Sequence, residues 1–151
     1  MCMGHFQGEI PVIPSFLILK GKRIVPVMFL VDTGCTNTIL SYPVSESAGI
    51  DLKGLEKVDI GGIGGIIQIY KLPGEIEIGL LDEESGKTIK AHVEPMNCVY
   101  VFGRECDRNP SLLGWDVLSR FETTFNRQQN DINLKRLNVM PRDHYILTLK
   151  E

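Results

Sequence analysis

Strand-length apolar runs, separated by short polar or glycine-containing breaks, recur along the whole of this 151-residue chain. The two longest, Phe16–Leu19 and Ile24–Val31, flank the polar segment Lys20–Arg23. Apolar runs of this length on either side of a short turn are typical of a β-hairpin. No apolar run approaches the roughly 20 residues that a membrane-spanning helix needs. The pattern therefore predicts an all-β fold and no membrane partner.

Other segments repeat this pattern and complete the expected set of strands. The expected strands, besides Ile24–Val31, are Ser15–Leu19, Thr38–Ser41, Ile66–Leu72, Glu75–Ile78, Thr88–Val93, Asn97–Phe102, Thr123–Asn126, Ile132–Leu137 and Tyr145–Leu149. Two short helices are expected, one within Ser45–Leu55 that begins at one of its two serines, and one at Trp115–Phe121. Asp82–Lys87 is expected to be a charged turn and Gly103–Pro110 a loop. With no internal repeat and no linker, the chain is predicted to form a single domain over residues 1–151.

Composition and charge exclude several classes of function. With 43% hydrophobic and 23% charged residues, the chain has the balance of an ordinary globular protein. The net charge is −3, and the basic clusters Lys20–Arg23 and Lys135–Arg136 are too short to form a stripe. This pattern indicates no nucleic-acid partner. The segment Met1–His5 lacks a basic stretch followed by an apolar core, so no secretory signal is recognised and a cytoplasmic location is predicted.

The cysteines and histidines indicate neither a disulfide framework nor a metal site. The cysteines form no CxxC pair and are Cys2, Cys35, Cys98 and Cys106. Without a secretory signal they are expected to be free thiols. Metal binding by Cys98, Cys106 and His92 is an alternative, but their spacing matches no familiar zinc pattern, so no metal or cofactor is predicted. The histidines His5, His92 and His144 are expected to lie on the surface without a partner.

The tripeptide Asp32-Thr33-Gly34 directly follows the apolar run Val27–Val31 and precedes the expected strand Thr38–Ser41. An aspartate at the end of an apolar strand can hold a carboxylate at the floor of a cleft, and glycine lets another backbone approach closely. A surface turn is the competing interpretation, because Asp-Xaa-Gly is common in turns. Surface turns are rarely flanked so closely by apolar strands, and this setting favours a functional carboxylate.

Two further glycine motifs follow. The segment Ile60–Ile66 alternates isoleucines with pairs of glycines, which suits a mobile hairpin that closes over a ligand. A phosphate-binding loop is the competing interpretation, but no Lys-Ser/Thr pair and no helix follow. The third motif, Leu112-Leu113-Gly114, places two apolar residues and a glycine directly before the expected second helix. Taken alone it is only a packing motif.

In this order, the three motifs resemble those of the retroviral-type aspartic proteases, or retropepsins. The resemblance spans about Pro14 to Phe121, and the glycine-rich segment is similar to the flap of the human immunodeficiency virus protease. It implies a closed β-barrel protomer that donates one aspartate and is active as a homodimer. The chain contains a single Asp-Thr-Gly, as such an arrangement requires; Asp82 and Asp116 lack this tripeptide.

The resemblance also implies an activity and a set of site residues. The implied activity is that of an aspartic endopeptidase, which hydrolyses peptide bonds in extended polypeptides with a water activated by an aspartate dyad. The residues implied in catalysis are Asp32, Thr33 and Gly34, and those implied in substrate binding are Ile63, Gly64, Gly65 and Ile66. Val31 and Ile39, like Ile66, are candidates for pocket walls, although Val31 and Ile39 fit core packing equally well.

The chain departs from the family pattern near the expected site. Cys35 stands where the family usually has Ala or Ser, and Thr36 and Trp115 replace an Asp and an Arg that form a pair. Because both partners are missing together, no unpaired buried charge is left behind. Trp115 is expected to pack rather than to contact substrate, and the strand Tyr145–Leu149 is expected to contribute to the dimer.

Two other functions fit parts of the sequence. A non-catalytic dimerisation or peptide-binding module could keep the same fold, since a fold does not guarantee activity. Such a module has no physical need for a carboxylate dyad, so the intact Asp32-Thr33-Gly34 weighs against it. A thiol-dependent redox protein that uses Cys98 and Cys106 is the second alternative.

Overall fold

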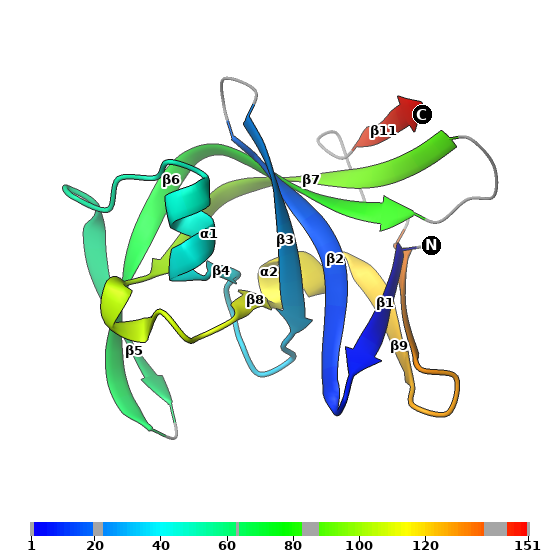
Figure 1. Ribbon diagram of the computed structural model, residues 1–151, viewed down its shortest axis with the longest axis horizontal. Helices are drawn as coiled ribbons and strands as arrows, with labels where there is room; N and C mark the ends of the chain where they lie inside the picture. Colours follow the sequence, from blue (N-terminus) through cyan, green and yellow to red (C-terminus); the bar gives the residue numbers. More distant parts are fainter. Residues whose placement is uncertain (1, 20–22, 63, 83–87, 138–144, 151) are drawn as a thin grey trace.

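The computed structural model describes residues 2–19, 23–62, 64–82, 88–137 and 145–150, with the backbone alone for 88–90 and 145–150 (Figure 1). Strands dominate these residues: β1 Cys2–Gln7, β2 Ile10–Leu19, β3 Arg23–Val31, β4 Ile39–Leu40, β5 Glu56–Gly62, β6 Gly65–Asp82, β7 Thr88–Phe102, β8 Ser111–Leu113, β9 Phe121–Asn126, β10 Asp131–Arg136 and β11 Tyr145–Lys150. The helices are α1 Tyr42–Ser47 and α2 Trp115–Leu118, and a 3₁₀ turn, η1, spans Arg104–Cys106. The expected all-β fold with short helices is confirmed. Neither α-helix in the described part of the chain is long enough to span a membrane.

The strands form one sheet that closes on itself. Its order is β11-β7-β4-β8-β3-β2-β6-β1-β10-β9, with β5 paired to β6. Because β6 also pairs with β7, the strands β7, β4, β8, β3, β2 and β6 form a closed ring, as a barrel requires. The predicted hairpin is confirmed by the antiparallel β2–β3 pairing up to Leu19 and Arg23. Its turn lies outside the described residues, as do residues 83–87 of the predicted charged turn and His144.

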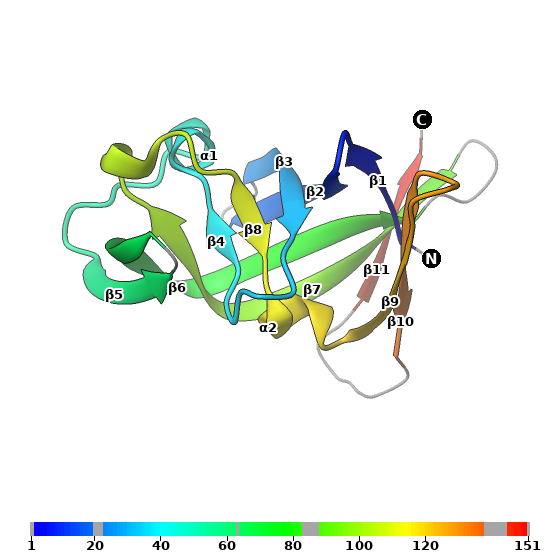
Figure 2. The same cartoon turned by 90° about the horizontal axis from the view of Figure 1, so that it is seen from below.

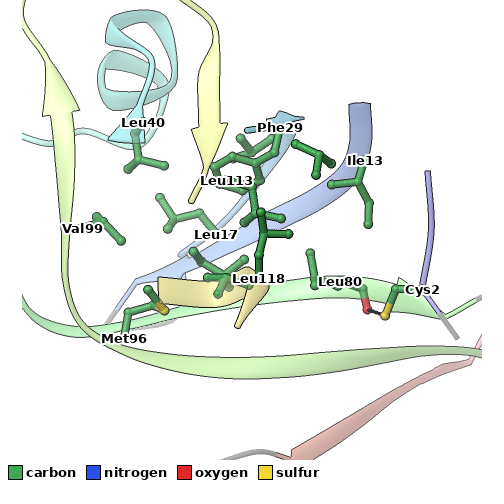
Figure 3. Close-up of a cluster of buried hydrophobic side chains, with 14 of the residues drawn as sticks. Cys2, Ile13, Leu17, Phe29, Leu40, Leu80, Met96, Val99, Leu113 and Leu118 are labelled. Atoms are coloured by element: carbon green, nitrogen blue, oxygen red, sulfur yellow. Dashed lines mark hydrogen bonds between the residues drawn. The ribbon is translucent and has the colours of Figure 1, made fainter. Parts of the chain in front are cut away.

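The hydrophobic core fills the interior of this ring. Alternate residues of β3 are buried, as expected for a strand with one face toward the core: Val25, Val27, Phe29 and Val31. Side chains from β2, β3, β8 and α2 meet at the centre of the core, where Leu17, Phe29, Leu113 and Leu118 point toward one another (Figure 3). Fully burying each such side chain contributes about 1.5–3 kcal/mol. The core therefore fixes the ends of β3 and β8 relative to each other.

Helix α1 begins earlier than the sequence analysis predicted. It spans Tyr42–Ser47 rather than starting within Ser45–Leu55. The hydroxyl of Ser41 accepts a hydrogen bond from the Val44 N–H at 3.3 Å and caps the helix. Pro43 lies in the first turn, where its missing N–H costs nothing. A serine cap followed by a proline therefore sets the start, and the later serines lie inside the helix.

Helix α2 is shorter than predicted, because Phe121 lies in a strand. The helix ends at Leu118, and Phe121 begins β9, where it pairs with Arg136 of β10. The Phe121 side chain is 5% exposed and belongs to the core. The three-residue spacing of Leu118 and Phe121 suggested one helical face, but Leu118 is buried at the end of α2 and Phe121 at the start of β9.

Strand β7 combines two strands that were predicted separately, Thr88–Val93 and Asn97–Phe102. Pro95 lies between them and pairs with Glu77 of β6. The other edge of β7 is paired by β11 and β4 only on either side of this point. A proline, which cannot donate to a sheet, is tolerated at such an unpaired edge. The prediction of two separate strands, Thr88–Val93 and Asn97–Phe102, was wrong for this reason.

A buried ion cluster joins β7 to the segments on either side of β9. The side chain of Glu94 is fully buried, and Arg136 Nε lies 2.6 Å from its Oε1. Arg120 Nη1 lies 3.2 Å from Glu94 Oε2 and also donates to the Pro95 carbonyl at 2.9 Å. A carboxylate without exposed surface is costly unless it is paired, and two guanidinium groups provide the pairing here.

Figure 2 shows how the remaining elements lie around the ring. The β5–β6 hairpin lies at one end of the molecule, and β9 and β10 lie at the other. Helix α2 and the loop between β3 and β4 lie beside each other between these ends. The loop that carries Asp32-Thr33-Gly34 therefore lies in the middle of the molecule, beside α2.

Candidate active site

Asp32 lies at the point where β3 ends, and its backbone and carboxylate are both held. Its N–H donates to the Leu113 carbonyl at 3.1 Å, which continues the parallel pairing of β3 with β8. Its own carbonyl accepts from the Cys35 N–H at 3.2 Å, and its Oδ1 accepts from the Gly34 N–H at 2.9 Å. The side chain is partly buried. Asp32-Thr33-Gly34 thus forms a tight turn that holds one carboxylate oxygen in place.

Gly114 brings the start of α2 against this turn. A Cβ at Gly114 would lie 2.6 Å from the Asn37 carbonyl carbon and 2.9 Å from the Cys35 carbonyl oxygen. Because both neighbours are backbone atoms, only glycine fits without moving the loop. The Trp115 N–H donates to the Cys35 carbonyl at 2.9 Å, and the Asp116 N–H donates to the Thr36 carbonyl at 3.2 Å. The third sequence motif therefore supports the first directly.

The sequence predicted nothing for Asp116 beyond its lack of an Asp-Thr-Gly tripeptide. It did not predict that Asp116 supports the Asp32 loop. Its Oδ2 accepts from the Thr38 N–H at 2.9 Å, and its Oδ1 accepts from the Thr38 hydroxyl at 2.7 Å. The same hydroxyl accepts from the Gly114 N–H at 3.1 Å. The available signal was an acidic residue in the first turn of a helix that follows a glycine motif.

Trp115 was expected to pack, but its side chain does not lie in the core. Its side chain is 48% exposed, and its indole N–H donates to the Thr33 carbonyl. The residue therefore contacts the turn that carries Asp32.

The predicted glycine-rich hairpin is confirmed by the antiparallel pairing of β5 and β6. The pairing runs to Gly62 opposite Gly65 at the tip. Gly65 has a φ of +113°, a backbone conformation that favours glycine. A Cβ on Gly61, Gly62, Gly64 or Gly65 would meet nothing within 4 Å, so crowding does not require these glycines. Of the predicted substrate-binding residues, Gly64, Gly65 and Ile66 are exposed, and Ile63 lies outside the described residues.

A pocket of about 200 Å³ lies between the Asp32 loop and this hairpin. Its lining residues are Gly34, Cys35, Thr36, Asn37, Ile39, Ile60, Gly61 and Ile69. The fold thus brings two sequence motifs to one cavity. Of the three predicted wall residues, Ile39 lines the pocket and Val31 is buried in the main core. Ile66 is 76% exposed and is not part of the lining.

The family model for aspartyl proteases matches residues 18–117, from the end of β2 through most of α2. The chain belongs to the aspartyl protease family. Among solved structures, it is similar to the crystal structure of a retropepsin-like aspartic protease from Rickettsia conorii, with 18% sequence identity and a TM-score of 0.59. That likeness covers 99% of this chain and 92% of the other, and it shows a retropepsin-like fold. A comparison with curated protein sequences finds no match.

The cysteines of this aspartyl protease family member are all free, as predicted. The Cys35 Sγ donates to the Asn37 carbonyl at 2.9 Å. Burial raises the pKa of the Cys35 thiol, and the charges of Asp32 and Asp116 add to the effect, although the Asn37 carbonyl contact opposes it. Burial also raises the pKa of Cys2 to about 12. Both thiols are therefore neutral near pH 7, which is unsuited to thiolate chemistry.

His92 differs from its expected place on the surface. Its Nε2 lies 3.2 Å from Asp82 Oδ2, and its side chain is 13% exposed. The pair connects the neighbouring strands β6 and β7, so His92 has a structural partner that the sequence did not reveal. Within the described ranges, no group of three or more His, Cys, Asp or Glu side chains is placed to hold a metal ion.

Proposed function

We propose that this chain is one protomer of a homodimeric aspartic endopeptidase, with Asp32 of each protomer forming the catalytic dyad. The observation that carries the proposal is the setting of Asp32. Its carboxylate is held by the Gly34 N–H, and Gly34 lines a pocket whose opposite wall comes from the glycine-rich hairpin. Because the sequence contains one Asp-Thr-Gly, a second copy must supply the second carboxylate.

Two facing carboxylates would divide the work of hydrolysis. At about 3 Å separation they cannot both be ionised, so they share one proton. The ionised carboxylate takes a proton from a water, whose oxygen attacks the scissile carbonyl carbon. The protonated carboxylate donates to the carbonyl oxygen, and the tetrahedral intermediate then breaks its C–N bond as the nitrogen takes up a proton. The two groups titrate as a unit.

The pocket supports an apolar substrate side chain beside the scissile bond. Its volume of about 200 Å³ and the side formed by Ile39, Ile60 and Ile69 suit one medium-sized aliphatic residue, while Thr36 and Asn37 make other parts of the lining polar. The β5–β6 hairpin would cover an extended peptide with its exposed tip, through Gly64, Gly65 and Ile66. We propose Ile63 as a further substrate contact.

The test compares the wild type with Asp32→Asn on an unstructured polypeptide, from about pH 4 to about pH 8. The exposed Asp51→Asn is the matched control, and sedimentation confirms that all proteins are dimers. Cleavage by the wild type and by the control, but not by Asp32→Asn, is the expected result. Cleavage by all three proteins would place the active site elsewhere. Saturable peptide binding without product, in dimers of all three, would instead support a non-catalytic binding module.

A further inference from the structure

Trp115 contacts the Asp32 loop at two carbonyl groups on either side of Gly34. Its backbone N–H donates to the Cys35 carbonyl at 2.9 Å, and its indole N–H donates to the Thr33 carbonyl. The first contact depends on the backbone and needs no particular side chain. The second is specific to a side chain that carries an N–H donor.

The indole reaches the Asp32 carboxylate through a single peptide group. The Thr33 carbonyl and the Gly34 N–H belong to the same planar peptide unit. Trp115 donates to the oxygen of this unit, and the unit's N–H donates to Asp32 Oδ1 at 2.9 Å. Hydrogen bonds in such a series polarise and strengthen one another. The indole N–H therefore both orients this peptide group and makes it a better donor to the carboxylate.

Packing does not account for a tryptophan at this position. The Trp115 side chain is 48% exposed, whereas Val117 and Leu118 of the same helix are buried and connect α2 to the core. Because nearly half of the Trp115 surface is exposed, packing constrains this side chain less than it constrains Val117 and Leu118. The contact that distinguishes an indole from another aromatic ring here is its N–H.

We propose that Trp115 is a positioning residue for Asp32, which it orients through the Thr33–Gly34 peptide group. The proposal rests on the proposed function, in which Asp32 forms the dyad. It assigns to α2 a role in the chemistry as well as in support of the loop. The other titratable side chains beside this loop are Cys35 within it and Asp116 on α2.

The sequence permits an unusually specific test, because Trp115 is the only tryptophan in the chain. Expression in a tryptophan auxotroph supplied with benzothienylalanine replaces the indole N–H by sulfur and keeps the two fused rings. Trp115→Phe removes the same donor by conventional mutagenesis. Met28→Leu, at a side chain that is 44% exposed on β3, serves as the control. Activity is measured on an unstructured polypeptide at protein concentrations that saturate dimer formation.

Loss of the donor is expected to lower kcat roughly tenfold, since a small displacement of a reacting group is costly in rate. KM is expected to stay unchanged, and the acidic limb of the pH–rate profile is expected to move to higher pH, because the ionised carboxylate loses support. An unchanged kcat and pH profile would overturn the proposal. A rise in KM alone would identify a substrate contact instead. Activity that recovers fully at higher protein concentration would identify a dimer contact.

A second measurement does not depend on activity. Hydrogen exchange of the Gly34 amide is compared between the wild type and the benzothienylalanine protein. The Lys53 amide is an internal control, because it donates to Asp51 Oδ1 at 2.9 Å in a turn of the same kind. Faster exchange at Gly34 with no change at Lys53 is expected, and unchanged Gly34 exchange would refute the positioning role. If the wild type cleaves nothing, the proposed function fails, while this comparison still decides whether Trp115 orders the loop.

Discussion

Asp116 accepts two hydrogen bonds from Thr38, one from the backbone N–H at 2.9 Å and one from the hydroxyl at 2.7 Å. The two residues are 78 positions apart in sequence. Thr38 is fully buried and ends the loop that begins at Asp32. This contact therefore fixes the far end of the loop to α2, while Trp115 contacts its middle.

Removing the Asp116 carboxylate is expected to destabilise the protein and to reduce its activity. Asp116→Ala leaves the buried Thr38 N–H and hydroxyl without their acceptor, which costs about 1–3 kcal/mol. Asp116→Asn keeps one acceptor oxygen and should cost less. Urea denaturation measures both variants, with the exposed Asp107→Ala as a control that should stay within about 0.5 kcal/mol of the wild type. Equal stability of Asp116→Ala and the control would show that this contact contributes nothing.

The buried Glu94 cluster is expected to be a major contributor to stability. Glu94→Ala leaves the largely buried Arg136 without its carboxylate partner, and breaking a buried pair in this way costs about 3–5 kcal/mol. Glu122→Ala on β9 removes an exposed carboxylate and serves as the control. The free energy of unfolding in urea separates the two variants. If Glu94→Ala lowers the free energy of unfolding by less than about 1 kcal/mol, the ion pairing only offsets the cost of removing these charges from water.

Gly114→Ala is expected to impair the site through a steric clash and not through backbone strain. Its φ of −97° suits any residue, but the added methyl would lie within 3.0 Å of backbone atoms of Asn37 and Cys35. The shift of the Asp32 loop that would relieve this clash can lower the cleavage rate roughly 100-fold. Gly62→Ala, whose methyl meets nothing, is the control for folding. Wild-type cleavage rates in Gly114→Ala would show that the loop tolerates the shift.

Cys2, which is buried, and Cys35, which is partly buried, are expected to resist alkylation in the folded protein. The thiolate is the reactive form, and a raised pKa keeps Cys35 and Cys2 protonated at neutral pH. Iodoacetamide near pH 7 should therefore label both more slowly in buffer than in urea, and raising the pH should speed the labelling of Cys35. Mass spectrometry of the peptides measures each site separately. Rapid labelling of Cys35 in buffer near pH 7 would show that its raised pKa does not protect this partly exposed thiol.

The sequence was sufficient to predict the parts of the site that depend on local pattern. Alternating burial along β3 follows from its alternating side chains, and the turn at Asp32 follows from a polar tripeptide after an apolar strand. The glycine-rich hairpin likewise follows from composition. The predicted start of α1 was wrong because a serine cap sets it, and the predicted end of α2 was wrong because Phe121 pairs in a sheet.

The supporting contacts could not be predicted, because they join residues far apart in the chain. Nothing near Trp115 in sequence indicates that its indole would bind the Thr33 carbonyl, 82 positions away, and nothing near Asp116 indicates Thr38 as a partner. These contacts exist only once the barrel has closed. Sequence pattern thus predicts which groups do the proposed chemistry, and tertiary structure determines what holds them in place.

Strand β8 lies between β3 and β4 in the sheet, although β3 and β4 are separated in sequence by only the Asp32 loop. The loop can take its final shape only after residues 111–116 have been synthesised and inserted between these strands. Such non-local pairing is slow to form. A chain still emerging from the ribosome would therefore carry its Asp-Thr-Gly segment long before that segment is assembled. The order of synthesis would in this way delay the proposed activity until most of the barrel is complete.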